Sequence, residues 1–185
     1  WYPGQAGGTA VADVLFGDYN PAGRLPITFY KSMQQLPDYE DYSMKGRTYR
    51  FMTETPLYPF GYGLSYTRFS YGKATLNQPK LNKGEKAILT IPVSNVGQRD
   101  GEEVVQVYIC RPDDKEGPQK TLRGFQRVSI AKGKTQNVQI ELPYDSFEWF
   151  DAATNTIRPL NGTYKILYGN SSNEKDLQTC SIQIQ

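Results

Sequence analysis

The chain has 185 residues, of which 38% are hydrophobic, enough for one ordinary domain with a core and part of a second. Its 21 basic and 19 acidic residues give a formal net charge of +2 without a basic run, which argues against nucleic acid or an anionic membrane as a partner. The absence of histidine excludes Ser-His-Asp and Cys-His catalysis and removes the commonest transition-metal ligand, so carboxylate chemistry is what remains.

The first 30 residues predict one helix and one strand. Residues 4–18, GQAGGTAVADVLFGD, carry apolar side chains at helical spacing, with Gly17 where a helix C-terminus favours it. Residues 23–29, GRLPITF, predict an edge or terminal strand, because Pro26 cannot donate a ladder hydrogen bond. One helix and one strand cannot close a core, so we interpret them as the last part of a larger α/β domain in a longer protein. A homodimer through this remnant is one arrangement that would cover its apolar face.

Two aromatic segments follow. The Tyr-rich stretch from Tyr39 to Phe51 is longer than most connections, and long loops are either functional or loosely ordered. Residues 56–69, PLYPFGYGLSYTRF, alternate aromatics with glycines, which fits a folding core, a platform for sugar rings or a joint between two domains. We favour the joint, because glycines let two backbones approach closely. The predicted joint residues are Tyr58, Phe60, Tyr62 and Tyr66.

Everything after about residue 69 shows the period-2 alternation of half-buried strands. Residues 86–97, KAILTIPVSNVG, place alternate apolar side chains on one face, and similar runs follow to the C-terminus. Turn sequences such as Asn161-Gly162 separate the runs. About seven strands without a helical period predict a mainly β fold, a fibronectin type III or immunoglobulin-like β-sandwich. The expected domains are therefore residues 1–68, the α/β remnant with its connecting segment, and residues 69–185, the sandwich.

The two cysteines, Cys110 and Cys180, are predicted to be free thiols. In GEEVVQVYIC, the alternation of Val105, Val107 and Ile109 points Cys110 away from the core. Cys180 instead shares the buried face of its own strand, LQTCSIQI. One sulfur facing outward and one facing inward do not favour a disulfide.

Three groups of acidic residues are the carboxylates that could act as general acid and base. They are Asp38, Glu40 and Asp41; Asp100, Glu102 and Glu103; and Asp113, Asp114 and Glu116. Nothing in the sequence supplies the apolar setting that would raise the pKa of one carboxyl above that of its neighbour. We therefore interpret them as solvated loop charge and expect no catalytic residue in this chain.

Several motifs, in order along the chain, together resemble the C-terminal end of glycoside hydrolase family 3 enzymes. They are WYPGQAGGTAVADVLFGDYNPAGRLPITFY, GRTYRF (residues 46–51), YPFGYGLSYT, EEVVQVYI and KTLRGFQRV. The resemblance implies the tail of an αβα sandwich domain, a connecting segment and an entire fibronectin type III-like domain. It also implies that the catalytic nucleophile and the acid/base come from upstream domains, that oligosaccharide substrate binds there, and that neither a metal nor an organic cofactor is used.

Within that family, GRTYRF together with Ala6, where many β-glucosidases have glutamate, resembles the β-xylosidase and α-arabinofuranosidase branch. The resemblance implies a periplasmic or extracellular exo-acting enzyme that removes terminal xylose, with a β-glucosidase as the alternative. The loop from Tyr39 to Phe51 would then either help to shape the substrate cleft or pack between domains. The candidates for the cleft are Tyr42, Arg47, Tyr49 and Arg50.

A function of another class stays open as well. A carbohydrate-binding module would need an exposed aromatic row. The two tryptophans are Trp1, at the N-terminus, and Trp149, in a short strand, and the absence of an evident Trp pair argues against such a module. An adhesion module would use a sheet edge or an exposed apolar patch. The sequence contains no pattern that names a protein partner.

Overall fold

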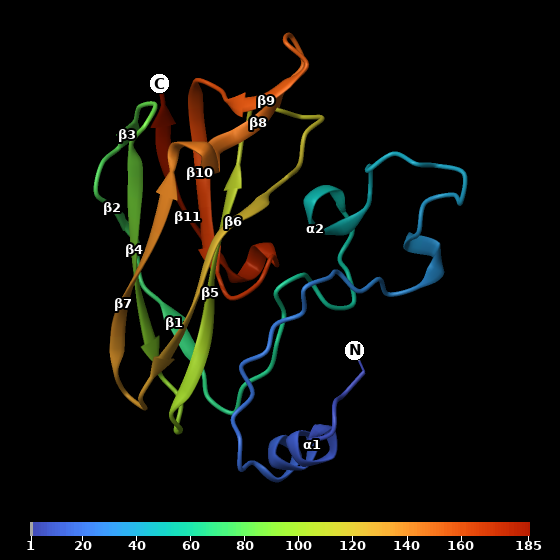
Figure 1. Cartoon of the computed structure of the whole chain (residues 1–185), viewed down its shortest axis with the longest axis vertical. Helices are drawn as coiled ribbons and strands as arrows, with labels where there is room; N and C mark the ends of the chain where they lie inside the picture. The colour runs from blue at the N-terminus through green and yellow to red at the C-terminus, as the bar shows by residue number, and fades with distance from the viewer. Residues whose placement is uncertain (1) are drawn as a thin grey trace.

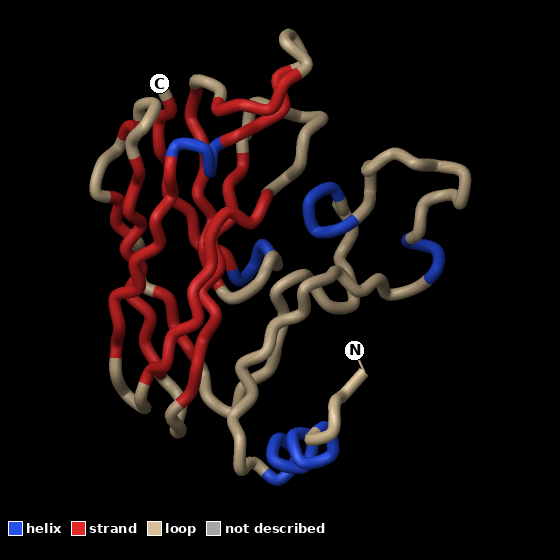
Figure 2. The backbone as a smooth tube through the Cα atoms, viewed as in Figure 1, coloured by secondary structure: helices blue, strands red, loops and turns tan. Residues whose placement is uncertain are grey.

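The computed structural model describes residues 2–185, so Trp1 lies outside the described residues. The chain consists of a β-sandwich and an irregular N-terminal arm, residues 2–68, that lies along one side of it (Figure 1). The arm contains the helix α1 (Gly7–Phe16), the 3₁₀ turn η1 (Met33–Gln35) and the single-turn helix α2 (Thr48–Phe51). Figure 2 shows that most of the remaining arm is loop, whereas the sandwich is mostly strand.

The sandwich contains eleven strands, which confirms the mainly β fold class. They are β1 (Phe69–Tyr71), β2 (Thr75–Leu76), β3 (Lys80–Leu81), β4 (Lys86–Asn95), β5 (Gly101–Cys110), β6 (Thr121–Ile130), β7 (Thr135–Pro143), β8 (Glu148–Asp151), β9 (Thr156–Pro159), β10 (Gly162–Gly169) and β11 (Leu177–Ile184). The 3₁₀ turns η2 (Tyr144–Phe147) and η3 (Glu174–Asp176) precede β8 and β11. The seven predicted strands correspond to β4 to β8, β10 and β11. The other four have two to four residues each, too short for alternation to reveal them.

Two sheets face each other across one core. In the first, β4 pairs with β1 and β2 along one edge and with β7 along the other. The second sheet has the order β3-β11-β10-β5-β6, in which β3 and β11 are parallel and the other neighbours are antiparallel. The short strands β8 and β9 form a separate hairpin at one end of the sandwich (Figure 1).

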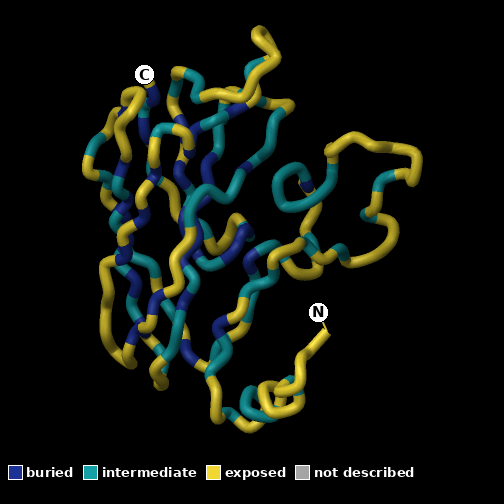
Figure 3. Tube along the Cα trace, in the orientation of Figure 1, coloured by how far each residue is buried: buried dark blue, intermediate teal, exposed yellow. Residues whose placement is uncertain are grey.

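The core between the sheets is built from the alternating faces that the sequence predicts. Leu89, Ile91 and Val93 of β4 are fully buried against Val107 of β5 and Ile166 of β10, among others. Figure 3 shows this contrast along the chain, with buried residues concentrated in the sandwich and exposed ones in the arm. At about 25 cal/mol per Å² of apolar surface removed from water, a core of this kind is the main source of stability.

Both cysteines are free, as predicted. Cys180 is partly buried and packs against the core, whereas Cys110 lies on the other face of β5. Burial raises the pKa of the Cys180 thiol to about 11. Burial also raises the pKa of the Cys110 thiol, although the nearby ammonium groups of Lys165 and Lys120 oppose the effect.

In the arm, the predicted helix forms, but the predicted strand does not. α1 ends at Gly17, which adopts a left-handed conformation with φ 85° and donates its N–H to Val14 O. Residues 23–29 instead run extended beside residues 57–62, with a single isolated bridge between Phe29 and Tyr58. The ladder is interrupted between this bridge and the hydrogen bonds of Leu25 with Gly61 and Tyr62, because Pro26 and Pro59 have no N–H to donate.

Side chains of α1 are largely uncovered. Val11, Leu15 and Phe16 expose 57%, 73% and 85% of their surface, and the helix buries no residue. Within residues 2–185, no helix is long and apolar enough to cross a membrane.

Candidate functional site

The arm meets the sandwich through an aromatic stack. Phe60 stacks on Tyr49, with ring centroids 4.3 Å apart and an interplanar angle of 22°. Both rings meet Tyr108 of β5 edge-on, at 5.8 Å for Tyr49 and 6.5 Å for Phe60. Because Tyr108 points away from the inter-sheet core, its burial comes from the arm, and β5 is covered on both faces. Edge-to-face and offset-stacked arrangements are the ones that aromatic rings favour.

Hydrogen bonds fix this contact at three places. The Ser172 N–H, between β10 and β11, donates to Phe60 O at 2.9 Å. The Gln119 N–H, just before β6, donates to Arg50 O at 2.7 Å. The Leu122 N–H of β6 donates to the Tyr49 hydroxyl at 3.1 Å. Two loops of the sandwich and one strand therefore hold α2 and the segment that contains Phe60.

The glycine in the middle of the aromatic segment is required by this close approach. Gly61 has φ 81°, and a Cβ built on it would lie 2.0 Å from Gln106 Oε1. The same Gln106 side chain donates to Gly61 O at 3.1 Å and to Asn170 O at 2.6 Å, and it accepts from the Tyr108 hydroxyl at 2.5 Å. A buried amide of β5 thus joins the arm to the loop after β10.

A buried ion pair forms the second contact. Arg24 Nη2 donates to Glu103 Oε1 at 2.8 Å, and Glu103 also accepts from the Val104 N–H at 2.8 Å. Burial raises the pKa of the Glu103 carboxyl, and the Arg24 guanidinium and the two hydrogen bonds partly offset that rise. The hydroxyl of Tyr71 is buried beside this pair without a hydrogen-bond partner, and burial raises its pKa strongly.

The four predicted joint residues make three different kinds of contact. Phe60 packs against the sandwich as described, whereas Tyr58 stacks on Tyr62 at 5.1 Å within the arm itself. Tyr66 donates its hydroxyl to Val14 O near the end of α1, and the Arg99 guanidinium lies 5.7 Å from its ring centroid. Since Arg99 belongs to the loop between β4 and β5, Tyr66 connects the helix to the sandwich.

The four predicted cleft residues are not brought together. Tyr49 and Arg50 lie in the joint, where Arg50 is 5.6 Å from the ring of Phe51. Tyr42 is 89% exposed on the long loop, which projects away from the sandwich in Figure 1. Arg47 donates to Ser43 O at 2.8 Å and to Asp41 O, so it holds the loop closed at its base.

Several residues of the acidic groups accept hydrogen bonds from neighbouring donors. Asp38 and Asp41 accept backbone N–H groups of their own turn, and the hydrogen bonds to Ser43 lower the pKa of Asp41. Asp114 accepts from Trp149 Nε1 at 2.5 Å and from the Gly117 N–H at 2.8 Å. Burial opposes these bonds, but together they lower its pKa. Glu103 faces Arg24, not a second carboxyl.

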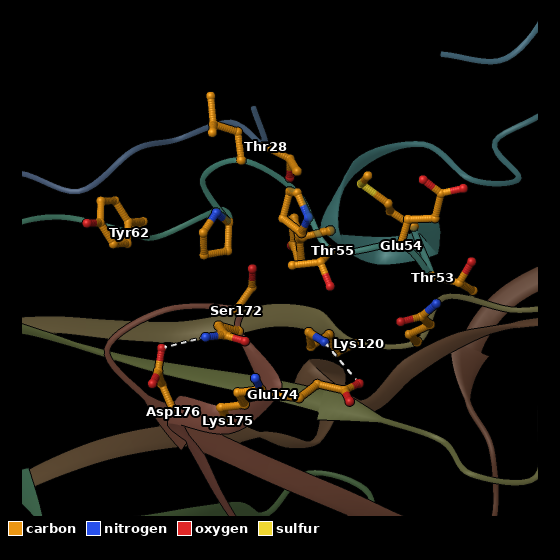
Figure 4. Close-up of a pocket in the computed structure, with 17 residues that line it drawn as sticks. Thr28, Thr53, Glu54, Thr55, Tyr62, Lys120, Ser172, Glu174, Lys175 and Asp176 are labelled. Atoms are coloured by element: carbon orange, nitrogen blue, oxygen red, sulfur yellow. Dashed lines mark hydrogen bonds and ion pairs between the residues drawn. The ribbon is translucent and has the colours of Figure 1, made fainter. Parts of the chain in front are cut away.

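A groove lies where the arm meets the loop after β10 (Figure 4). Its volume is about 460 Å³. One wall is the stretch 52–59 of the arm, and the other is formed by Gln119 and Lys120 before β6 and by residues 172–176. Sequence reasoning missed Lys120 as a site residue, because the KTLRGFQRV motif that it opens indicates only a strand and its groove partners are far away in the chain.

A second hollow lies beside the β8–β9 hairpin. It is lined by Trp149 and Phe150 on one side and by Arg111 and the Asp113–Pro118 loop on the other. Two of its carboxylates are engaged, since Asp151 pairs with Arg158 at 2.5 Å and Asp114 accepts from Trp149 Nε1. In the described part of the chain, no group of His, Cys, Asp or Glu side chains could hold a metal ion.

Comparisons with known proteins agree with this architecture. Residues 1–66 match the family model described as glycosyl hydrolase family 3 C-terminal domain, and residues 103–172 match that of the fibronectin type III-like domain. A xylan 1,4-beta-xylosidase of Xylanibacter ruminicola is 55% identical over 184 residues, which cover 100% of this chain and 21% of that protein. A periplasmic beta-glucosidase of Salmonella typhimurium is 37% identical over 82% of this chain and 21% of its own length.

A solved structure gives the same result. The structure of a β-glucosidase from Erythrobacter marinus superposes with a TM-score of 0.83 at 38% identity, covering 100% of this chain and 24% of that one. The chain therefore spans about a quarter or less of each of these three proteins. It belongs to glycoside hydrolase family 3 and carries that family's C-terminal domain, followed by a fibronectin type III-like domain.

Proposed function

We propose that this chain is the C-terminal part of a retaining exo-β-glycosidase that removes terminal xylose from xylo-oligosaccharides. The observation that carries the proposal is the 55% identity, along the whole chain, to a protein named xylan 1,4-beta-xylosidase. The identity to the Salmonella protein named beta-glucosidase is lower, at 37%. A β-glucosidase is the second candidate, since the Erythrobacter structure is also named for that activity.

The chemistry assigns the catalytic groups to another part of the longer protein. Retaining hydrolysis requires two carboxyl groups about 5–5.5 Å apart, one as nucleophile and one as acid and then base. The acid must have a raised pKa. Burial does raise the pKa of the Glu103 carboxyl, but this carboxyl is paired with Arg24 and lines neither hollow. We therefore expect the 185-residue chain alone to hydrolyse no glycoside.

In the longer protein, the chain would act by holding the long loop. The sandwich fixes α2 through the Tyr49 hydroxyl and Arg50 O, and α2 is the C-terminal base of that loop. Arg47 fastens the same base through Ser43 O. Tyr42 is the residue of the four that is free to reach a substrate cleft, because its side chain is 89% exposed. Arg47, Tyr49 and Arg50 would position it.

The uncovered apolar face of the arm also fits a longer protein. Val11, Leu15 and Phe16 of α1 would pack against the rest of the α/β domain, and a homodimer through this face is the alternative. Sedimentation of the chain with and without its upstream sequence distinguishes packing against the α/β domain from dimerisation. We expect the upstream sequence to abolish any dimer if it covers this face, and a dimer that persists in the longer protein supports the second copy. We further propose a periplasmic or extracellular location, in line with the named location of the Salmonella relative.

The direct test is hydrolysis of aryl β-xyloside and aryl β-glucoside by the 185-residue chain and by the same chain extended upstream. We expect activity in the extended chain alone, with the higher kcat/KM on the xyloside. A higher kcat/KM on the glucoside would replace the xylosidase assignment with the glucosidase. Hydrolysis by the short chain would show that one of its acidic groups is catalytic after all.

A further inference from the structure

The groove of Figure 4 has the size and lining of a small-molecule site. Its volume of about 460 Å³ falls within the roughly 300–1,000 Å³ of typical ligand pockets. Its walls come from segments more than 100 residues apart, because Thr55 lies in one wall and Ser172 in the other. The hydrogen bond from the Ser172 N–H to Phe60 O holds the two walls at a fixed separation.

Lys120 is the unusual residue of this groove. It is 5% exposed, although lysine is almost never buried unless it is paired. Its charge partner is Glu174, whose carboxylate oxygen lies 3.6 Å from Nζ, longer than a hydrogen bond. The Glu174 side chain is itself 82% exposed, so its position costs little to change. The ammonium group therefore retains hydrogen-bonding capacity, and Lys120 lines the groove.

Charge at the groove is nearly balanced. Its lining includes the carboxylates of Glu54, Glu174 and Asp176 and the ammonium groups of Lys120 and Lys175. This balance disfavours a phosphate or another strongly charged ligand, which would meet repulsion as well as attraction. A ligand with many hydroxyl groups is complementary to it, since each hydroxyl can donate to a carboxylate and accept from an ammonium.

Flat apolar surfaces complete the lining. Tyr49 and Tyr62 line the groove together with Pro56, Leu57 and Pro59. Phe60 stacks on Tyr49 and Tyr58 stacks on Tyr62, so both rings are held in place before any ligand arrives. Preorganised rings lose little conformational entropy on binding, and their faces suit the C–H faces of pyranose rings.

We propose that this groove is an accessory binding site for a neutral oligosaccharide, with Lys120 donating to a sugar hydroxyl and the ring of Tyr62 packing against a pyranose face. The identity of the sugar as xylose rests on the proposed function above. The site holds a chain of sugar units on the C-terminal region of the enzyme, apart from the catalytic carboxyls, which this chain does not supply.

The test is affinity electrophoresis of the longer enzyme in gels containing soluble xylan, with excess xylose added to occupy the catalytic subsite. Lys120→Met removes the ammonium and keeps much of the side-chain volume, and Thr55→Trp places an indole in the groove from an exposed rim position. Lys115→Met and Thr75→Trp are the matched controls, because both residues are exposed and lie outside the groove. Thermal unfolding checks that each variant is folded.

We expect the xylan to retard the wild type and both controls, and each groove variant to bind at least about tenfold more weakly, which corresponds to about 1.4 kcal/mol. If the Lys120→Met variant does not fold, the retardation of the Thr55→Trp variant alone tests the site. Equal retardation of the wild type and Thr55→Trp, or no retardation of the wild type, overturns the site. Hydrolysis of aryl β-xyloside by the wild type is measured in parallel. If the enzyme is active on the xyloside but is not retarded by xylan, the binding site is wrong and the proposed function still stands.

Discussion

Arg24 of the arm and Glu103 of β5 form an ion pair at 2.8 Å, and their side chains are 9% and 2% exposed. Another pair in the sandwich, Lys86 with Glu141, has the same distance, but its side chains are 55% and 59% exposed. Exposed pairs contribute about 0–1 kcal/mol, whereas removing one partner of a buried pair costs about 3–5 kcal/mol. The burial of the first pair makes the arm and the sandwich depend on each other.

Arg24→Met should therefore lower the free energy of unfolding by about 3 kcal/mol, because it leaves the Glu103 carboxyl buried without a counter-charge. Urea unfolding of the chain measures this value. Lys86→Met is the matched control and should cost less than about 1 kcal/mol. Similar losses in the two variants would mean that the buried pair does not tie the arm to the sandwich.

The Glu103 carboxyl should also make stability depend on pH. Its ordinary pKa is 4.5, and burial raises this value in the folded protein despite the Arg24 guanidinium. A raised pKa means that the folded state binds the proton more tightly, so the contribution is complete below pH 4.5 and is lost as the pH rises through the folded pKa. The difference in unfolding free energy between the wild type and the non-titrating Glu103→Gln variant should fall from pH 4 to pH 7. A difference that grows with pH would show that attraction to Arg24 outweighs burial.

Gly61→Ala should destabilise the protein much more than Gly84→Ala. The two glycines have similar φ angles, 81° and 86°, so the backbone cost of about 1–2 kcal/mol is common to both. A Cβ at Gly61 would lie 2.0 Å from Gln106 Oε1, whereas a Cβ at Gly84 meets nothing within 4 Å. We expect the Gly61 variant to lose roughly 2 kcal/mol more in urea unfolding, because the buried Gln106 amide must move. Equal losses would contradict the close approach.

The two thiols should react slowly in the folded protein. With its pKa raised to about 11, Cys180 is about one part in a thousand thiolate at pH 8. An aryl disulfide such as dithiobis(nitrobenzoate) should therefore label two thiols rapidly in urea. In buffer it should label Cys180 at least about a hundredfold more slowly. The Cys180→Ala variant identifies which phase belongs to which thiol. Failure to label two thiols in urea without reductant would indicate a disulfide.

The spacing of apolar residues was sufficient to predict the long strands and the helix α1. Alternate apolar residues in β4 and β5 predict which side chains enter the core, and Val105, Val107 and Ile109 are all fully buried. The same pattern predicts that Cys110 faces away from the core. It could not predict that Gln106 and Tyr108, on the outer face of β5, are buried as well, since their cover comes from the arm about 50 residues earlier.

The candidate groove shows the same limit. Its wall residue Pro56 belongs to the aromatic segment 56–69 and Lys120 opens the KTLRGFQRV motif, but Thr55 and Glu174 belong to no motif. The sequence offers Tyr42, Tyr49 and Arg50 as cleft candidates and favours packing between domains as the role of their loop. The structure separates them, since the Leu122 N–H binds the Tyr49 hydroxyl and Tyr42 stays on the free part of the loop.

By itself, the sequence determined the mainly β sandwich, its long strands and turns, the two free thiols and the resemblance to one enzyme family. These follow from local chemistry, namely the period-2 burial of a strand, the left-handed glycines such as Gly84 and Gly133, and motifs read in order. Only the tertiary structure decided that Arg24 pairs with Glu103, that Phe60 and Tyr49 cover Tyr108, and that Lys120 faces a groove. Those contacts join residues about 50 to 80 positions apart. Whether such residues meet depends on how the folded arm packs on the sandwich, which no local pattern encodes.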